Sequence, residues 1–141
     1  MASVKIQGLK QVLRDISDDV KGYNQAVDLG VLVTANEIRR HSVLSIDDQS
    51  NGEPRNASKR DNHIISKEGQ APNTDLGGLV GSIKVSHITG SDEAIVFSNL
   101  DYAAYLEFIL DRPWLEPAMI AKADQLKPNI EAQMLKIRGL K

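Results

Sequence analysis

The stretch YAAYLEFILDRPWLEPAM, Tyr102–Met119, gathers aromatic side chains that the rest of the chain lacks. It holds two of the three tyrosines, one of the two phenylalanines and the only tryptophan, in a sequence that is 4% aromatic. Tyr102, Tyr105 and Leu106 have the spacing of one helix face, which predicts a short helix pinned against a sheet. Trp114 then anchors the start of a last helix. The stretch therefore predicts a short helix packed on the sheet, followed by a tryptophan that holds the start of the last helix.

Within this stretch, Glu107 lies between Leu106 and Phe108, so a charge is embedded in an apolar run. A carboxylate in such a place needs a polar partner. Either an arginine or free backbone N–H groups can serve, and Arg112 is the first candidate because it is close in sequence. The residues expected to serve the fold and the contacts between subunits are Tyr102, Tyr105, Glu107, Phe108, Arg112 and Trp114.

The length of the chain and its hydrophobic and charged fractions indicate one ordinary globular domain over residues 1–141. The chain has no cysteine, which excludes disulfides, thiolate zinc sites and cysteine nucleophiles. The net charge of −2 does not favour nucleic-acid binding. We expect no signal peptide and no membrane span, because no apolar run has the required length.

The N-terminal third reads as a short strand followed by two helices. Val4 and Ile6 alternate with polar residues, which suits an opening strand. An apolar stripe at helical spacing then predicts a first helix of about three turns, which Gly22 and Asn24 should break. The stripe comprises Leu9, Val12, Leu13, Ile16 and Val20. A second helix is expected over 25–45, with one face made of Val27, Val31, Ala35, Ile38 and Ser42.

Residues 47–75 are too polar to offset the entropy of ordering them, and we interpret them as a long mobile loop. Ile64 and Ile65 are its only adjacent large apolar residues. We therefore expect this pair to be the point at which the loop docks onto another surface in an assembly.

The remainder predicts a β-hairpin and a C-terminal helix. Residues 83–87 and 94–97 alternate around a turn at 89–92. Pro117 suits the first turn of the last helix, and Pro128 should kink or divide it. The whole reads as an α+β fold, in which a small, mostly antiparallel sheet packs against two N-terminal helices and a long C-terminal helix.

No active site is predicted. The histidines His41, His63 and His87 lie in three unrelated contexts and are expected to be solvated. The glycines near residue 78 do not follow a strand and open a helix, as a phosphate-binding loop would. No nucleophile elbow surrounds a serine. We therefore expect a protein that is not an enzyme and that carries no metal or cofactor.

Several pieces of the sequence, in order, resemble the tail-completion family of tailed bacteriophages, also called head–tail joining or neck proteins. The family opens with I-x-G-L and carries P-x-x-D-T-G-x-L-x-x-S-I, then Y-A-x-Y-L-E-F-G-T, then R-P-F-L-x-P-A. The matching pieces here are Ile6–Leu9, APNTDLGGLVGSI, YAAYLEF and RPWLEPA. The family's Gly-Thr after Glu-Phe is replaced by Ile109-Leu110. The paired last two pieces are the most specific, and together the pieces span nearly the whole chain.

The resemblance implies a structural protein of the virion neck. Such a subunit would form a ring, expected to be a hexamer, between the head-connector (stopper) protein and the tail tube protein. DNA would pass through the ring without specific binding, and the virion would be assembled in the bacterial cytoplasm. The alternative is a small nucleic-acid-binding regulator that uses Arg39, Arg40 and the basic loop residues Arg55, Lys59, Arg60 and Lys67.

Overall fold

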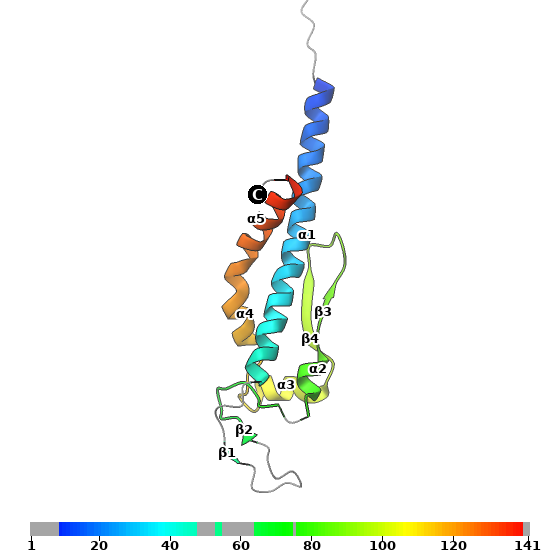
Figure 1. Cartoon of the computed structure of the whole chain (residues 1–141). Helices are drawn as coiled ribbons and strands as arrows, with labels where there is room; N and C mark the ends of the chain where they lie inside the picture. The colour runs from blue at the N-terminus through cyan, green and yellow to red at the C-terminus, as the bar shows by residue number, and fades with distance from the viewer. Residues whose placement is uncertain (1–8, 48–52, 55–63, 75, 140–141) are drawn as a thin grey trace, which may run out of the picture.

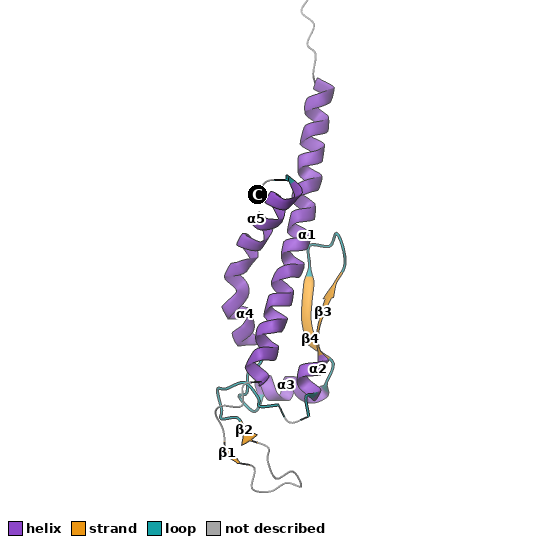
Figure 2. Ribbon diagram, viewed as in Figure 1, coloured by secondary structure: helices purple, strands orange, loops and turns teal. Residues whose placement is uncertain are grey.

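The computed structural model describes residues 9–47, 53–54, 64–74 and 76–139. Its elements confirm an α+β fold. A long helix, α1 (Leu9–Asp47), runs the length of the molecule (Figures 1 and 2). The hairpin of β3 (Ile83–His87) and β4 (Ala94–Ser98) and the C-terminal helices α4 (Glu116–Lys122) and α5 (Leu126–Ile137) lie along it. The predicted opening strand at Val4 and Ile6 lies outside the described residues.

The prediction of two N-terminal helices is wrong, because α1 runs through Gly22 and Asn24 without a break. A single glycine in a helix costs about 1 kcal/mol relative to alanine, and tertiary packing exceeds that cost here. A Cβ on Gly30 would lie 2.5 Å from Ile130 Cγ1 and 2.8 Å from Ile130 Cα. The missing side chain thus lets the backbone of α5 approach α1 closely, which alanine would prevent.

The hairpin consists of β3 (Ile83–His87) and β4 (Ala94–Ser98), paired antiparallel with Val85 opposite Val96. This confirms the predicted strand–turn–strand pattern. A short helix that the sequence did not predict, α2 (Gly78–Ser82), leads directly into β3. Gly77 precedes it at a φ of 74°, a conformation that glycine adopts without steric cost.

Two side chains of α1 fasten the hairpin to the helix. Asp28 Oδ1 lies 2.8 Å from His87 Nε2 and accepts the backbone N–H of Gly90 at 2.9 Å. Arg39 Nε donates to the carbonyl of Ile83 at 2.8 Å. The prediction that His87 is solvated is therefore wrong, since its side chain is only 9% exposed. The alternating sequence of β3 does not reveal that α1 lies against this strand and places Asp28 next to His87.

The C-terminal segment runs back along α1 as α4 (Glu116–Lys122), a 3₁₀ turn η1 (Ala123–Gln125) and α5 (Leu126–Ile137). Pro117 lies in the first turn of α4 and Pro128 in the first turn of α5, where their missing N–H groups are tolerated. The predicted division of this helix near Pro128 is confirmed.

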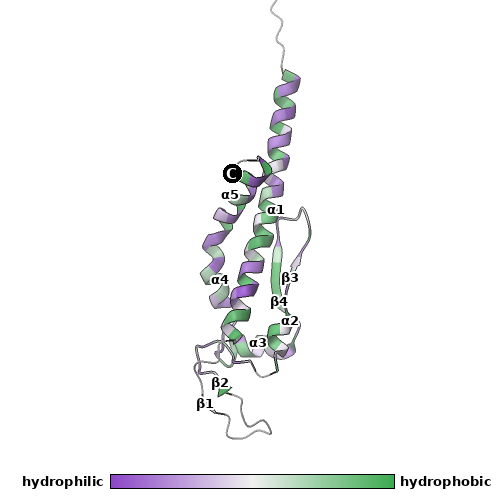
Figure 3. Ribbon diagram, viewed as in Figure 1, coloured by the Kyte–Doolittle hydropathy of each residue, from purple (hydrophilic) through white to green (hydrophobic). Residues whose placement is uncertain are grey.

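The core lies at the end of the molecule where α1, α2, the hairpin and α3 (Asp101–Phe108) meet. Its buried residues are Ile46, Leu79, Ile83, Ala103 and Trp114. Figure 3 shows that apolar residues continue along α1 away from this core, to the end opposite α3.

Part of the predicted loop is included in the described residues. Glu53–Pro54 (β1) and Ile64–Ile65 (β2) pair antiparallel. Beyond β2, the chain returns to the body, where Thr74 N–H donates to the carbonyl of Ile46 at 3.2 Å. Ser66 and Pro72 are buried. The described part of residues 64–74 is thus packed against the domain, although its composition is polar.

Candidate assembly surfaces

Glu107 joins the two most specific sequence pieces into one structural unit. Its carboxylate accepts three consecutive backbone N–H groups, from Trp114 at 2.7 Å, Leu115 at 3.1 Å and Glu116 at 2.8 Å. These groups lie at the start of α4, which has no side-chain cap of its own. Glu107 therefore caps α4 from a neighbouring helix. Of the two predicted partners, the backbone N–H groups are confirmed, and the pairing with Arg112 is wrong.

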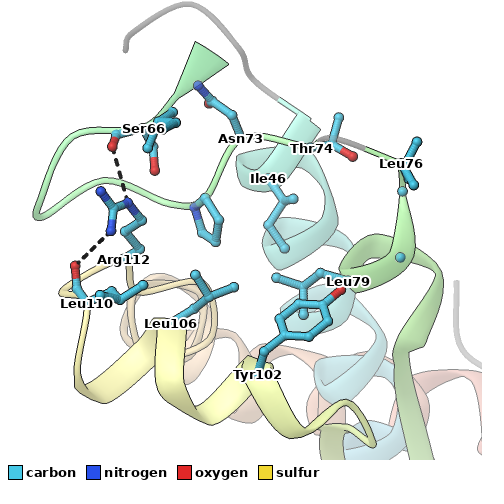
Figure 4. Close-up of a pocket in the computed structure, with 14 residues that line it drawn as sticks. Ile46, Ser66, Asn73, Thr74, Leu76, Leu79, Tyr102, Leu106, Leu110 and Arg112 are labelled. Atoms are coloured by element: carbon cyan, nitrogen blue, oxygen red, sulfur yellow. Dashed lines mark hydrogen bonds between the residues drawn. The ribbon is translucent and has the colours of Figure 1, made fainter. Parts of the chain in front are cut away.

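Arg112 has a different role in the same corner. Its Nε donates to the carbonyl of Ser66 at 3.2 Å, and its Nη1 donates to the carbonyl of Leu110 at 3.3 Å (Figure 4). Gly69 N–H also donates to the carbonyl of Asp111 at 2.6 Å. Arg112 thus holds the segment after β2 against the turn between α3 and α4.

Trp114 occupies the core, as the sequence predicts. Its side chain is 4% exposed. Its indole Nε1 donates to the carbonyl of Ala103 at 3.0 Å, which satisfies the polar atom of this buried ring. The tryptophan therefore connects α3 to the start of α4 from the inside, while Glu107 connects them at the backbone.

The other aromatic residues of the stretch do not pin α3 against the sheet, and that prediction is wrong. Tyr102, Tyr105 and Phe108 are all exposed, Phe108 to 78%. Ala103 and Glu107 occupy the buried face of α3 instead. Small and charged residues face inward because Trp114 and the backbone of α4 fill that space. Ile109 after α3 and Met119 and Ile120 of α4 are exposed as well. We call these exposed apolar residues of α3, α4 and the turn between them the corner.

A groove of about 710 Å³ lies between this corner and the end of α1 (Figure 4). Its apolar lining includes Tyr102, Leu79 and Ile46 from the body, together with Ile65 and Pro72 from the segment that returns to it. Ile64 is half-buried, and its carbonyl accepts the side-chain amide of Asn73 at 3.0 Å. The structure thus places the predicted docking pair against the subunit's own core region; contact of the pair with another subunit stays a prediction.

The first turns of α1 form an apolar surface that no other described helix or strand covers over most of its length. We call this segment, Leu9–Tyr23, the arm. The arm projects past α5, whose last residue, Ile137, approaches α1 at Gly22 (Figure 1). Its apolar side chains are each between 53% and 64% exposed: Leu9, Val12, Leu13, Ile16, Val20 and Tyr23. The stripe was visible in the sequence, but its exposure depends on where α5 ends.

Apart from these apolar surfaces, the described residues offer few groups that could form a binding site. Among the described residues, no three histidine or carboxylate side chains gather in a way that could hold a metal ion. Nor does any described helix have the length and apolar character needed to cross a membrane. Of the residues named for nucleic-acid binding, Arg39 is engaged with Ile83, Arg40 and Lys67 are exposed, and Arg55, Lys59 and Arg60 lie outside the described residues.

Searches against models of protein families, against curated proteins and against solved structures found no match to this chain.

Proposed function

We propose that the protein is a structural subunit of a bacteriophage neck, which forms a ring, a hexamer, between the head-connector protein and the tail tube. The observation that carries this proposal is the arm, an apolar helical surface that projects from a folded body. Exposed contiguous apolar surface of this kind marks a site of association with another protein.

The positions of the apolar surfaces support a ring. The arm lies at one end of α1, and α3 and the start of α4 lie near the other end (Figure 1). Tyr105 and Phe108 of α3 and Ile120 of α4 are exposed. Each subunit of a closed ring contacts a neighbour on both of its flanks, and a subunit with two separate apolar surfaces can make more than one contact with its neighbours. A chain whose net charge is −2 also suits a channel through which DNA slides without being held.

The resemblance of the sequence to the tail-completion family suggests where such a ring would lie, at the junction of head and tail. The pieces YAAYLEF and RPWLEPA are bound together by the three hydrogen bonds of Glu107. These two pieces thus form one capped corner, which gives a physical reason for their joint occurrence. The function that follows is to complete the tail and join it to the head, within the virion.

The test is the assembly state of the purified chain. We expect native mass spectrometry and negative-stain images to show a closed ring, and Ile16→Asp to shift it toward monomer because a charge enters the apolar stripe. Gln25→Asp is the matched control, since it adds the same charge on an exposed residue outside the stripe. A chain that stays monomeric at all concentrations, or binds DNA with a salt-dependent gel shift, would contradict the proposal.

A further inference from the structure

The apolar stripe of the arm has the spacing of a coiled coil. Leu9, Leu13, Ile16, Val20 and Tyr23 follow one another in alternating steps of four and three residues. This is the a/d pattern of a heptad, which seats one helix against another helix of the same kind. The arm rises about 21 Å from Leu9 to Tyr23, and within the described residues no helix of the same subunit runs beside most of it.

The two flanks of the stripe carry opposite charge. On a helix with this period, Lys10, Arg14 and Lys21 lie on one side of the stripe, and Asp15 and Asp19 lie on the other. The acidic flank is the side that faces α5, since Asp19 lies 3.8 Å from Arg138, which follows α5. The arm therefore has one basic and one acidic edge along the same apolar stripe.

Contacts within the subunit leave these charges available. The Asp19–Arg138 pair has side chains 73% and 52% exposed, and Lys21 pairs with Asp18 at 3.8 Å with both side chains more than three-quarters exposed. Asp15 accepts the side-chain amide of Gln11 on the surface. Exposed pairs of this kind contribute little to stability, so a neighbouring helix can exchange them at small cost.

We infer that the arms of neighbouring copies pack side by side in a parallel orientation, with the basic edge of one arm against the acidic edge of the next. Parallel helices related by a rotation bring opposite flanks together, whereas antiparallel helices related by a two-fold axis bring like flanks together. The charges therefore favour the parallel arrangement and oppose the antiparallel one. This inference rests on the proposed ring, and it names the surface through which the copies meet.

Cysteine cross-linking distinguishes the orientations, because the chain has no cysteine of its own. A disulfide forms when two Cα atoms approach to about 4.4–6.8 Å. We expect Leu9→Cys to cross-link with itself and Tyr23→Cys to cross-link with itself under mild oxidation or with a short bis-maleimide. Cross-links only in a mixture of the two variants would show antiparallel arms and overturn the inference, as would no cross-link in any sample.

Charge reversal provides the second test. Asp15→Lys with Asp19→Lys makes both edges basic. Lys10→Glu with Arg14→Glu leaves Lys21 as the remaining cation of the basic edge and gives that edge a net negative charge. We expect each double variant alone to lose the assembled species in native mass spectrometry, and an equimolar mixture to recover it as alternating copies. Failure of the mixture to recover it, or no loss in either variant, would overturn the inference.

These outcomes distinguish a failure of the inferred packing of the arms from a failure of the proposed ring. A wild-type ring that both double variants retain would leave the proposed function standing while overturning the parallel packing of the arms. A wild-type dimer or trimer that cross-links at both cysteine positions would support the packing of the arms while overturning the ring.

Discussion

Glu107 is the residue whose replacement tests the reasoning most directly. The residue is 9% exposed, and its carboxylate accepts three backbone N–H groups at the start of α4 that have no partner within that helix. In Glu107→Ala, the N–H of buried Trp114 loses its partner, whereas those of Leu115 and Glu116 lie closer to water. Loss of a charged hydrogen bond costs about 2 kcal/mol, and loss of a helix cap costs about 1 kcal/mol.

The expected destabilisation is therefore about 3 kcal/mol in the free energy of unfolding. For a domain of this size, that change corresponds to a decrease of roughly 10 °C in Tm. Urea denaturation followed by tryptophan fluorescence measures it, because Trp114 is the only tryptophan and lies beside the site. All variants are compared at one protein concentration, since association of the native state also stabilises it.

Two variants serve as controls for Glu107→Ala. Glu93→Ala removes an exposed carboxylate, and we expect a change within ~0.5 kcal/mol. Glu107→Gln retains the shape but directs an amide NH₂ at an N–H donor, so it should cost at least half as much as the alanine variant. A loss below ~1 kcal/mol for Glu107→Ala would refute the assignment of Glu107 as the cap of α4.

Three further changes test the packing of the body. Trp114→Ala should cost about 3–5 kcal/mol in urea denaturation followed by far-UV circular dichroism, because this variant has no tryptophan left to report by fluorescence; a loss under ~1 kcal/mol would show that the indole does not hold the core. Gly30→Ala should destabilise the fold by about 1–3 kcal/mol, although alanine has the better helix propensity, because its Cβ would meet the backbone of α5. Gly22→Ala should be tolerated, since the nearest atom to its Cβ lies at 3.4 Å. Equal Tm values for the two variants would contradict this packing. Asp28→Ala removes the contacts of Asp28 with His87 and with the N–H of Gly90, so it should speed hydrogen exchange in the hairpin without affecting α5. Unchanged protection of the hairpin would show that these two contacts contribute little.

Local patterns in the sequence were sufficient for the elements whose residues interact mainly with their neighbours. The alternation around residues 83–97 predicts the hairpin, and Pro117 and Pro128 predict where the C-terminal helices begin. The need of Glu107 for a polar partner also follows from sequence, since a carboxylate in an apolar run cannot stay unpaired. Each of these conclusions depends on backbone geometry or on the solvation of one side chain, which act over a few residues.

Contacts between distant segments decided the rest. Gly22 and Asn24 predicted a break between two helices, but α1 continues through both, and α5 packs against it at Gly22 and Gly30. The same packing ends at Ile137 and leaves the stripe of the arm uncovered, although the stripe by itself resembles that of a buried helix. Arg112 was the nearest cation to Glu107 in sequence, yet the first N–H groups of α4 lie closer in space. Hydrophobic burial and hydrogen bonding depend on distance in space, so only the tertiary structure decides which of these residues are buried in the core and which stay exposed.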